Sequence, residues 1–198
     1  KVFAGIVIAP IGGLIVGLLL TGLIITVFAK RRPAPVNKVF GKLQIISSAW
    51  FALTHGANDG QKTMGIIALI LFSAGLIPEL EIPLWVIFAA AAAMGLGTFF
   101  GGYKVIKTLG VKITRLRPYQ GFAAETGGGL MLAAFAILGI PASTTHAITG
   151  TIMGAGAARR KLAVRWKVSR QIVFSWIITI PGAAAMGIGF TYLIHLFV

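Results

Sequence analysis

The 198-residue chain is 57% hydrophobic and only 11% charged, whereas soluble domains carry roughly 25% charged residues, so the composition excludes a soluble globular protein. The net charge is +14, yet 16 of the 18 Lys and Arg lie in the segments 30–42, 104–117 and 159–170. This clustering is typical of cytoplasmic loops and not of a nucleic-acid-binding surface. We therefore predict an all-α, polytopic membrane protein whose partner is the lipid bilayer, with no nucleic acid.

The first half of the chain contains two apolar segments. Residues 1–29 hold an uncharged run from Val2 that is long enough to span a bilayer with some tilt. Residues 30–42 follow as a basic loop, which we expect to be cytoplasmic. The next apolar segment, 43–77, is too long for one straight span. We expect a broken helix near Gly56–Gly60, since glycine lets the backbone leave helical geometry.

The second half contains a span, a hairpin and a further span. The acidic turn Pro78–Pro83 precedes an apolar run of membrane length, 84–103. Residues 119–158 form one long apolar stretch between two basic loops. Because both loops are expected on the cytoplasmic side, this stretch must return to the side where it began. It is therefore predicted to be a helical hairpin with its tip at 141–146, and 171–198 is predicted to be the last span.

Two charges lie within the apolar segment 43–77. A charge at membrane depth costs roughly 2.5–3.5 kcal/mol, which makes Asp59 and Lys62 functional candidates. Their neighbours Asn58, Gln61 and Thr63 carry oxygens suited to a hard cation or to hydrogen bonds with a protonated oxyanion. The alternative is a glycine-kinked helix in which Lys62 only neutralises Asp59.

The predicted hairpin supplies a binding site for an anion. A helix N-terminus binds anions through free N–H groups, and Ser143, Thr144 and Thr145 add hydroxyls there. The alternative is a capped helix turn. Glu125 is either a coupling-ion ligand or the partner of a loop cation, and His55 is assigned to packing. The sequence contains no nucleophile–base pair and we expect no cofactor, so we do not predict an enzyme. The oxygen-rich segment 58–63 and the helix N-terminus at the hairpin together predict co-transport of an anion with Na+ or H+.

A short internal echo points to duplication. Lys1–Val7 resembles Lys167–Val173, at an offset of 166 residues. Duplicated units are common in secondary transporters, although chance similarity between hydrophobic spans is the alternative. If the echo is real, 1–29 is the closing span of a preceding repeat. The chain also begins at Lys1 without Met, and we expect an N-terminal half that this sequence does not contain.

Two motifs together resemble the inorganic phosphate transporter (PiT) family. They are His55–Gly60, which reads His-Gly-Ala-Asn-Asp-Gly, and Gly139–Gly150. The similarity runs from about Phe40 to the C-terminus. It implies an inverted-repeat secondary transporter, with 43–198 as the second repeat. It further implies a symporter that imports inorganic phosphate with Na+ or H+ across the prokaryotic inner membrane, while a homo-oligomer is left open.

The resemblance also assigns residues. It matches Asp59, Glu125 and Ser143 to the family's functional aspartate, glutamate and hairpin serine. The segment 58–63 reads Asn-Asp-Gly-Gln-Lys-Thr in place of Asn-Asp-Val-Ala-Asn-Ala, a variant typical of prokaryotic members, which leaves the coupling ion open. The expected phosphate-binding residues are Asn58, Asp59, Gln61, Thr63, Ser143, Thr144 and Thr145. The expected coupling-ion ligands are Asp59, Asn58, Glu125 and Thr145.

Two alternative functions stay open at this point. One is transport of another oxyanion, such as sulfate, and the other is a channel-like or structural membrane subunit. Asp59 bears on the first, because an acceptor-only carboxylate near the anion favours an oxyanion that still carries a proton. Phosphate carries one at neutral pH, whereas sulfate does not.

The loop charges generate a topological prediction. The turn Pro78–Pro83 holds two glutamates and no Lys or Arg, so it should face the side opposite the basic loops. The chain has no native cysteine, so single cysteines introduced at Leu80 and Thr108 can be labelled from one side of the membrane. Only one of the two should react with an impermeant maleimide, and equal labelling would refute the topology.

Overall fold

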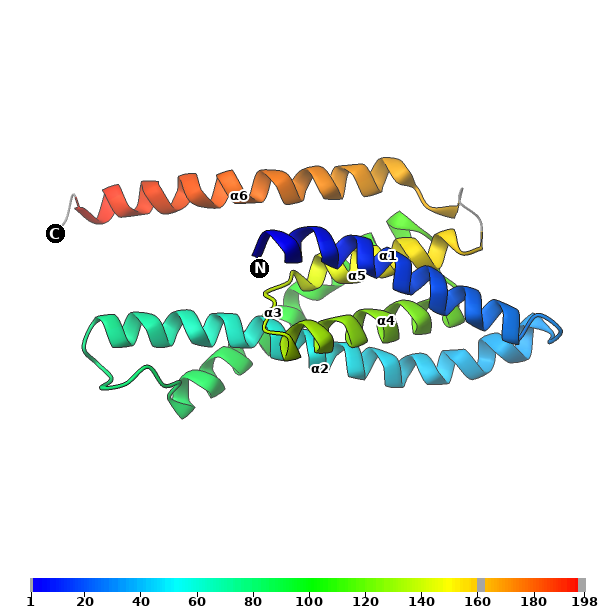
Figure 1. Cartoon of the computed structure of the whole chain (residues 1–198), viewed down its shortest axis with the longest axis horizontal. Helices are drawn as coiled ribbons and strands as arrows, with labels where there is room; N and C mark the ends of the chain where they lie inside the picture. Colours follow the sequence, from blue (N-terminus) through cyan, green and yellow to red (C-terminus); the bar gives the residue numbers. More distant parts are fainter. Residues whose placement is uncertain (1, 160–162, 196–198) are drawn as a thin grey trace. The chain divides into compact units, whose positions relative to one another are not determined.

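The computed structural model describes residues 2–159 and 163–195, where the regular structure is helical (Figure 1). The all-α class is thereby confirmed. The helices are α1 Val2–Val27, α2 Pro33–Ser73, α3 Leu84–Lys107, the π-helix η1 Thr108–Ile113, α4 Pro118–Ile137, α5 Thr144–Ala157 and α6 Trp166–His195. They divide into two compact units, Lys1–Val164 and Arg165–Val198. The second unit contains α6, and the first contains the other helices just named.

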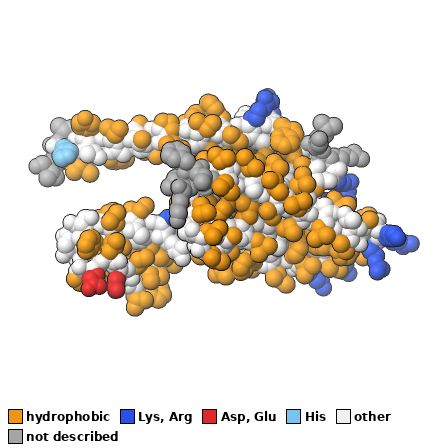
Figure 2. All heavy atoms as spheres, in the orientation of Figure 1, with side chains coloured by type: hydrophobic (Ala, Val, Ile, Leu, Met, Phe, Trp, Pro, Cys, Tyr) orange, Lys and Arg blue, Asp and Glu red, His pale blue; other side chains and the backbone are white. Residues whose placement is uncertain are grey.

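Three helices among the described residues are long and apolar enough to cross a membrane. They cover Gly5–Val27, Leu84–Tyr103 and Trp166–His195, and they correspond to the predicted spans 2–29, 84–103 and 171–198. Hydrophobic side chains cover much of the visible surface, while Lys and Arg gather where α1 meets α2 (Figure 2). The acidic side chains visible in this view lie beside the turn between α2 and α3. The basic and acidic clusters visible in this view thus lie at opposite ends of α2.

The predicted break near Gly56–Gly60 is wrong. α2 runs without interruption over 41 residues, a length of about 60 Å, or twice the hydrocarbon core of a bilayer. Its first turns also occupy most of the segment 30–42, which is a loop only as far as Arg32. Glycine permits a break but does not impose one. Where water is absent, each retained backbone hydrogen bond favours the continuous helix.

The two glycines that do leave helical geometry lie at helix ends. Gly139 has φ +60, and its N–H bonds to Ala136 O while Ile140 N–H bonds to Phe135 O. This pair of bonds is a Schellman motif, which needs a residue in the left-handed region after the helix. Gly75, with φ +71, ends α2 in the same way. Gly139 closes α4 shortly before α5 begins at Thr144, so the predicted hairpin is confirmed.

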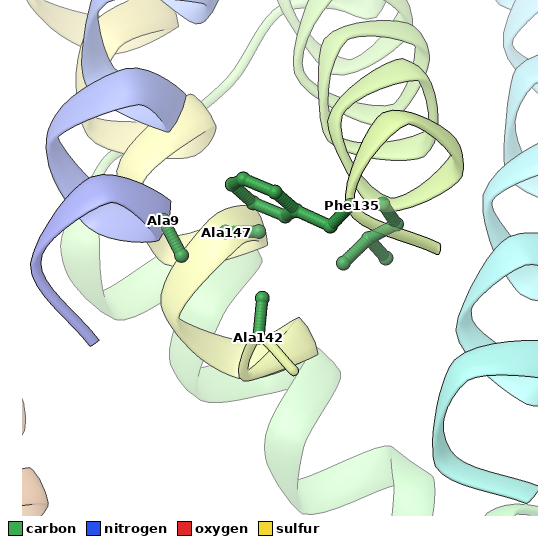
Figure 3. Close-up of a cluster of buried hydrophobic side chains, with 5 residues drawn as sticks. Ala9, Phe135, Ala142 and Ala147 are labelled. Atoms are coloured by element: carbon green, nitrogen blue, oxygen red, sulfur yellow. The ribbon is translucent and has the colours of Figure 1, made fainter. Parts of the chain in front are cut away.

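Buried side chains from three helices meet beside the hairpin tip. Ala9 of α1, Leu132 and Phe135 of α4, and Ala142 and Ala147 around the start of α5 form this cluster. Figure 3 shows the labelled members of the cluster pointing toward one another. Burying this apolar group fixes the tip against α1 and α4, and α2 packs along α4. The start of α5 is therefore held at a set position beside the middle of α2.

Small residues bring α1 and α5 into direct backbone contact. A Cβ at Gly17 would overlap the Thr151 backbone, and one at Gly150 would overlap the Pro10 carbonyl. A Cβ at Gly154 would overlap Leu14 O in the same way. This is the close packing through glycine that membrane helices use.

This contact gives a stability prediction with an internal control. Gly17→Ala places a methyl group against the Thr151 backbone, and such overpacking costs about 1–3 kcal/mol. Gly22, on the same helix, has no atom within 4 Å of a built Cβ. The melting temperature of the purified protein should fall for Gly17→Ala and stay level or rise slightly for Gly22→Ala. Equal melting temperatures would contradict the close contact.

Candidate functional site

The Asp59 carboxylate lies where the two sequence motifs meet. Its Oδ2 accepts a hydrogen bond of 2.9 Å from Thr144 Oγ1, at the start of α5. His55 Nε2 lies 3.1 Å from the same oxygen, and Lys62 Nζ lies 3.0 Å from Oδ1. Both carboxylate oxygens are therefore engaged, and the carboxylate connects α2 to the hairpin tip.

Lys62 makes a second bond to the hairpin. Its ammonium donates to the backbone carbonyl of Ala142 over 2.7 Å. Ala142 is buried and comes two residues before α5 begins. The hairpin tip is thus held to α2 through Thr144 and through Ala142, on either side of the Asp59 carboxylate.

The continuity of α2 explains how these side chains come together. His55, Asp59 and Lys62 are spaced by four and three residues, so a regular helix places them on one face. A break at Gly56–Gly60 would have changed their relative orientation. The sequence interpretation assigned His55 to packing only. The ring does stack on Phe51, with ring centroids 5.8 Å apart, but His55 also contacts Asp59. The helical spacing was the signal that could have placed His55 beside Asp59.

Asn58 faces a different neighbour, helix α4. The residue is 7% exposed, and its Nδ2 donates to Thr54 O over 3.0 Å and to Leu132 O over 3.3 Å. The side chain therefore joins α2 to α4 through backbone acceptors. Asn58 directly precedes Asp59 in the chain, but its side-chain nitrogen bonds to these backbone carbonyls and not to the Asp59 carboxylate.

The three hydroxyl residues of the tip have different surroundings. Ser143 is the N-cap of α5, and its Oγ accepts from His146 N over 3.4 Å. Thr144 is buried against Asp59, whereas Thr145 is exposed. The capped-turn interpretation of Ser143 is thus correct in geometry, and it is compatible with an anion site because the capped terminus still carries the helix dipole.

Gln61 and Thr63, the remaining predicted phosphate ligands, are exposed on α2. Thr63 Oγ1 donates to the Asp59 backbone carbonyl over 3.2 Å, within the same helix. The contacts described above between the Asp59 carboxylate and the hairpin involve neither residue. Their predicted role as ligands remains a proposal.

Glu125 forms a second polar centre between α4 and α2. Its Oε2 accepts from Ser47 Oγ over 2.6 Å, and its Oε1 accepts from Gln44 Nε2 over 3.2 Å. The sequence left two roles open for Glu125, a ligand of the coupling ion or the partner of a loop cation. Its partners in the structure are neutral side chains of α2 and not a loop cation. Ser47 precedes Asp59 by 12 residues on one continuous helix, a distance of about 18 Å along its axis. The structure therefore does not bring Glu125 together with Asp59.

Comparison with known proteins places this chain among transporters. The family model described as "Phosphate transporter family" matches residues 27–187. A probable low-affinity inorganic phosphate transporter of Rhizobium meliloti (strain 1021) is 49% identical over 185 residues, which cover 93% of this chain and 55% of that protein. Its counterpart in Bacillus subtilis (strain 168) is 39% identical over 188 residues, which cover 94% of this chain and 56% of that protein. The chain thus spans about half the length of these curated relatives.

A solved structure also resembles this fold. It is described as "The sodium-dependent phosphate transporter", and it matches with a TM-score of 0.65 and 27% sequence identity. The match covers 90% of this chain and 53% of the other. The fold of this chain therefore resembles that of an experimental structure.

The contact between Asn58 and α4 gives a prediction about stability. Asn58→Ala removes one interhelical hydrogen bond, a loss that averages about 0.6 kcal/mol in membrane proteins. Asn58→Asp instead directs a carboxylate at two backbone carbonyls, so it should destabilise more, by about 1–3 kcal/mol for unsatisfied buried groups. Thermal unfolding of both purified variants checks this order. A melting temperature of Asn58→Asp at or above that of Asn58→Ala would contradict the contact between the Asn58 amide and Leu132 O.

Proposed function

The chain belongs to the phosphate transporter family, and from that premise we propose that it forms one half of a secondary active transporter of inorganic phosphate. Transport would be coupled to Na+ or H+, across the inner membrane of a prokaryotic cell. The observation that carries the proposal is the bond between Asp59 and Thr144, two residues 85 positions apart. Both lie within the matched region 27–187. The family is one of transporters and not of enzymes.

The proposed phosphate site is the N-terminus of α5. The free N–H groups of the first turn and the helix dipole attract an anion there. Ser143 and Thr145 add hydroxyls at the same end of the helix, and Asn58, Gln61 and Thr63 belong to the facing segment of α2. Asp59, an acceptor beside this terminus, favours an anion that still carries a proton. That preference is met by phosphate and not by sulfate.

The arrangement implies an exchange of hydrogen bonds during transport. His55, Lys62 and Thr144 all contact the Asp59 carboxylate. For Thr144 to donate to phosphate, its hydroxyl must turn away from Asp59. We propose that phosphate binding breaks this bond and that its re-formation closes the site. Movement of the hairpin tip relative to α2 would then alternate access between the two sides of the membrane.

Glu125 is proposed as a coupling-ion ligand separate from the phosphate site. Its carboxylate and the Ser47 hydroxyl lie within 2.6 Å of each other, and such oxygens suit a hard monovalent cation or a proton. Asp59, Asn58 and Thr145, the other expected coupling-ion ligands, lie at the other polar centre, where Lys62 supplies a positive charge beside Asp59. Sodium dependence belongs to the description of the solved relative, and it comes to this chain only as part of the proposal.

The whole transporter is proposed to contain a second unit related to this one. The support is the echo between Lys1–Val7 and Lys167–Val173, together with relatives about twice as long as the chain. In the proposed transporter, phosphate lies between the hairpin tip and matching segments of the second unit. The lipid bilayer is its other partner.

Asp59→Asn tests the proposed function directly. The change keeps the shape of the side chain but removes its charge, so the Lys62 ammonium loses its counter-ion. Uptake of labelled phosphate into proteoliposomes that contain the full gene product should fall at least about tenfold, equivalent to ~1.4 kcal/mol.

Glu79→Gln removes a carboxylate from the turn before α3 and serves as the matched control, with uptake close to that of the wild type. Both variants must match the wild type in melting temperature and size-exclusion profile. Cation-dependent uptake at the wild-type rate by Asp59→Asn would mean that the Asp59 contact is only structural.

A further inference from the structure

Lys62 stands at the centre of an oxygen-lined position between α2 and the hairpin tip. Its Nζ lies 3.0 Å from Asp59 Oδ1 and 2.7 Å from Ala142 O. The ammonium thus bridges a carboxylate on α2 and a backbone carbonyl 80 residues away in the chain. One positive charge is placed where the two motifs of the proposed site meet.

The oxygens around this ammonium are those that a small monovalent cation uses. Exposed backbone carbonyls at interrupted helices and acidic side chains coordinate Na+ in secondary transporters. Here Ala142 O is a carbonyl of that kind, just before α5, and Asp59 supplies the carboxylate. The tethered ammonium therefore has the charge and the oxygen contacts of a bound cation.

An ordinary surface ion pair does not account for this geometry. Lys62 and Asp59 are spaced i,i+3, with side chains 41% and 34% exposed, and such pairs contribute little to stability. However, the shorter of the two Lys62 bonds goes to Ala142 O in the hairpin and not to Asp59. An ion pair that only made one face of α2 polar toward solvent would not need this second contact with the hairpin.

We propose that Lys62 is a built-in counter-cation, which occupies the position between Asp59 and Ala142 O that a coupling Na+ would otherwise take. This inference rests on the proposed function and identifies a residue that determines its cation requirement. Because like charges repel at close range, the ammonium and Na+ do not share the position. In this half of the transporter, the charge of Asp59 is thus neutralised by Lys62 and not by a bound coupling ion.

Removal of the ammonium tests the proposal. Lys62→Gln leaves the Asp59 carboxylate and the Ala142 carbonyl without their cation. The purified full gene product in detergent should then bind about one more radioactive Na+ per molecule than the wild type. In the double variant Asp59→Asn/Lys62→Gln this additional Na+ should be lost. Lys62→Arg, which keeps the charge, and Lys42→Gln, a change near the start of α2 and away from the hairpin tip, should both bind Na+ as the wild type does.

Transport provides a second readout. In proteoliposomes, phosphate uptake by Lys62→Gln should rise at least about tenfold more between Na+-free buffer and saturating Na+ than uptake by the wild type does. Lys42→Gln should reproduce the wild-type response to Na+. An unchanged Na+ response together with unchanged Na+ binding in folded Lys62→Gln would overturn the proposal.

The single variant Asp59→Asn offers a test that does not depend on the folding of Lys62→Gln. If Lys62 occupies the position, Asp59→Asn binds as much Na+ as the wild type. Loss of one bound Na+ in Asp59→Asn would show that Na+ and Lys62 share Asp59, which would also overturn the proposal. Failure of the wild type to take up phosphate would instead refute the proposed function, while the binding measurements in detergent would still decide the role of Lys62.

Discussion

The contact between the Asp59 carboxylate and the hairpin tip is the interaction on which the proposed site depends. Thr144 Oγ1 donates to one carboxylate oxygen, while Lys62 bonds to the other and to Ala142 O. A charge at membrane depth is tolerated only where it is paired or reaches water. The hairpin supplies part of that pairing, so the placement of the tip and the contacts of the Asp59 carboxylate support each other.

The position of the tip in turn depends on how closely α1 and α5 approach. Glycines on both helices face backbone atoms of the other helix, and a methyl group at Gly17 or Gly154 would push the helices apart. The apolar cluster of Ala9, Phe135 and Ala147 then fixes the tip beside α4 (Figure 3). Packing far from Asp59 thereby determines whether Thr144 can reach it.

The uninterrupted helix α2 connects two polar centres. Ser47 and Gln44 bind Glu125 near its first third, and Asp59 and Lys62 contact the hairpin nearer its end. Because a continuous helix transmits displacement along its axis, we infer that a shift of α2 at one centre also displaces the residues of the other centre. In the proposed transporter, coupling of cation and phosphate would then depend on α2 remaining unbroken.

The all-α class, the spans and the hairpin followed from the sequence alone, because they depend on hydropathy and on the charge of the loops. The residues of the site also followed in part, since Asp59 and Thr144 are polar groups in apolar surroundings. Tertiary structure decided that α2 is continuous, that Lys62 also reaches Ala142 O of the hairpin, and that Glu125 binds Ser47. A glycine only permits a break, and whether one occurs depends on the neighbours that pack around it. The direction in which a side chain points depends on that same continuity, which local sequence does not reveal.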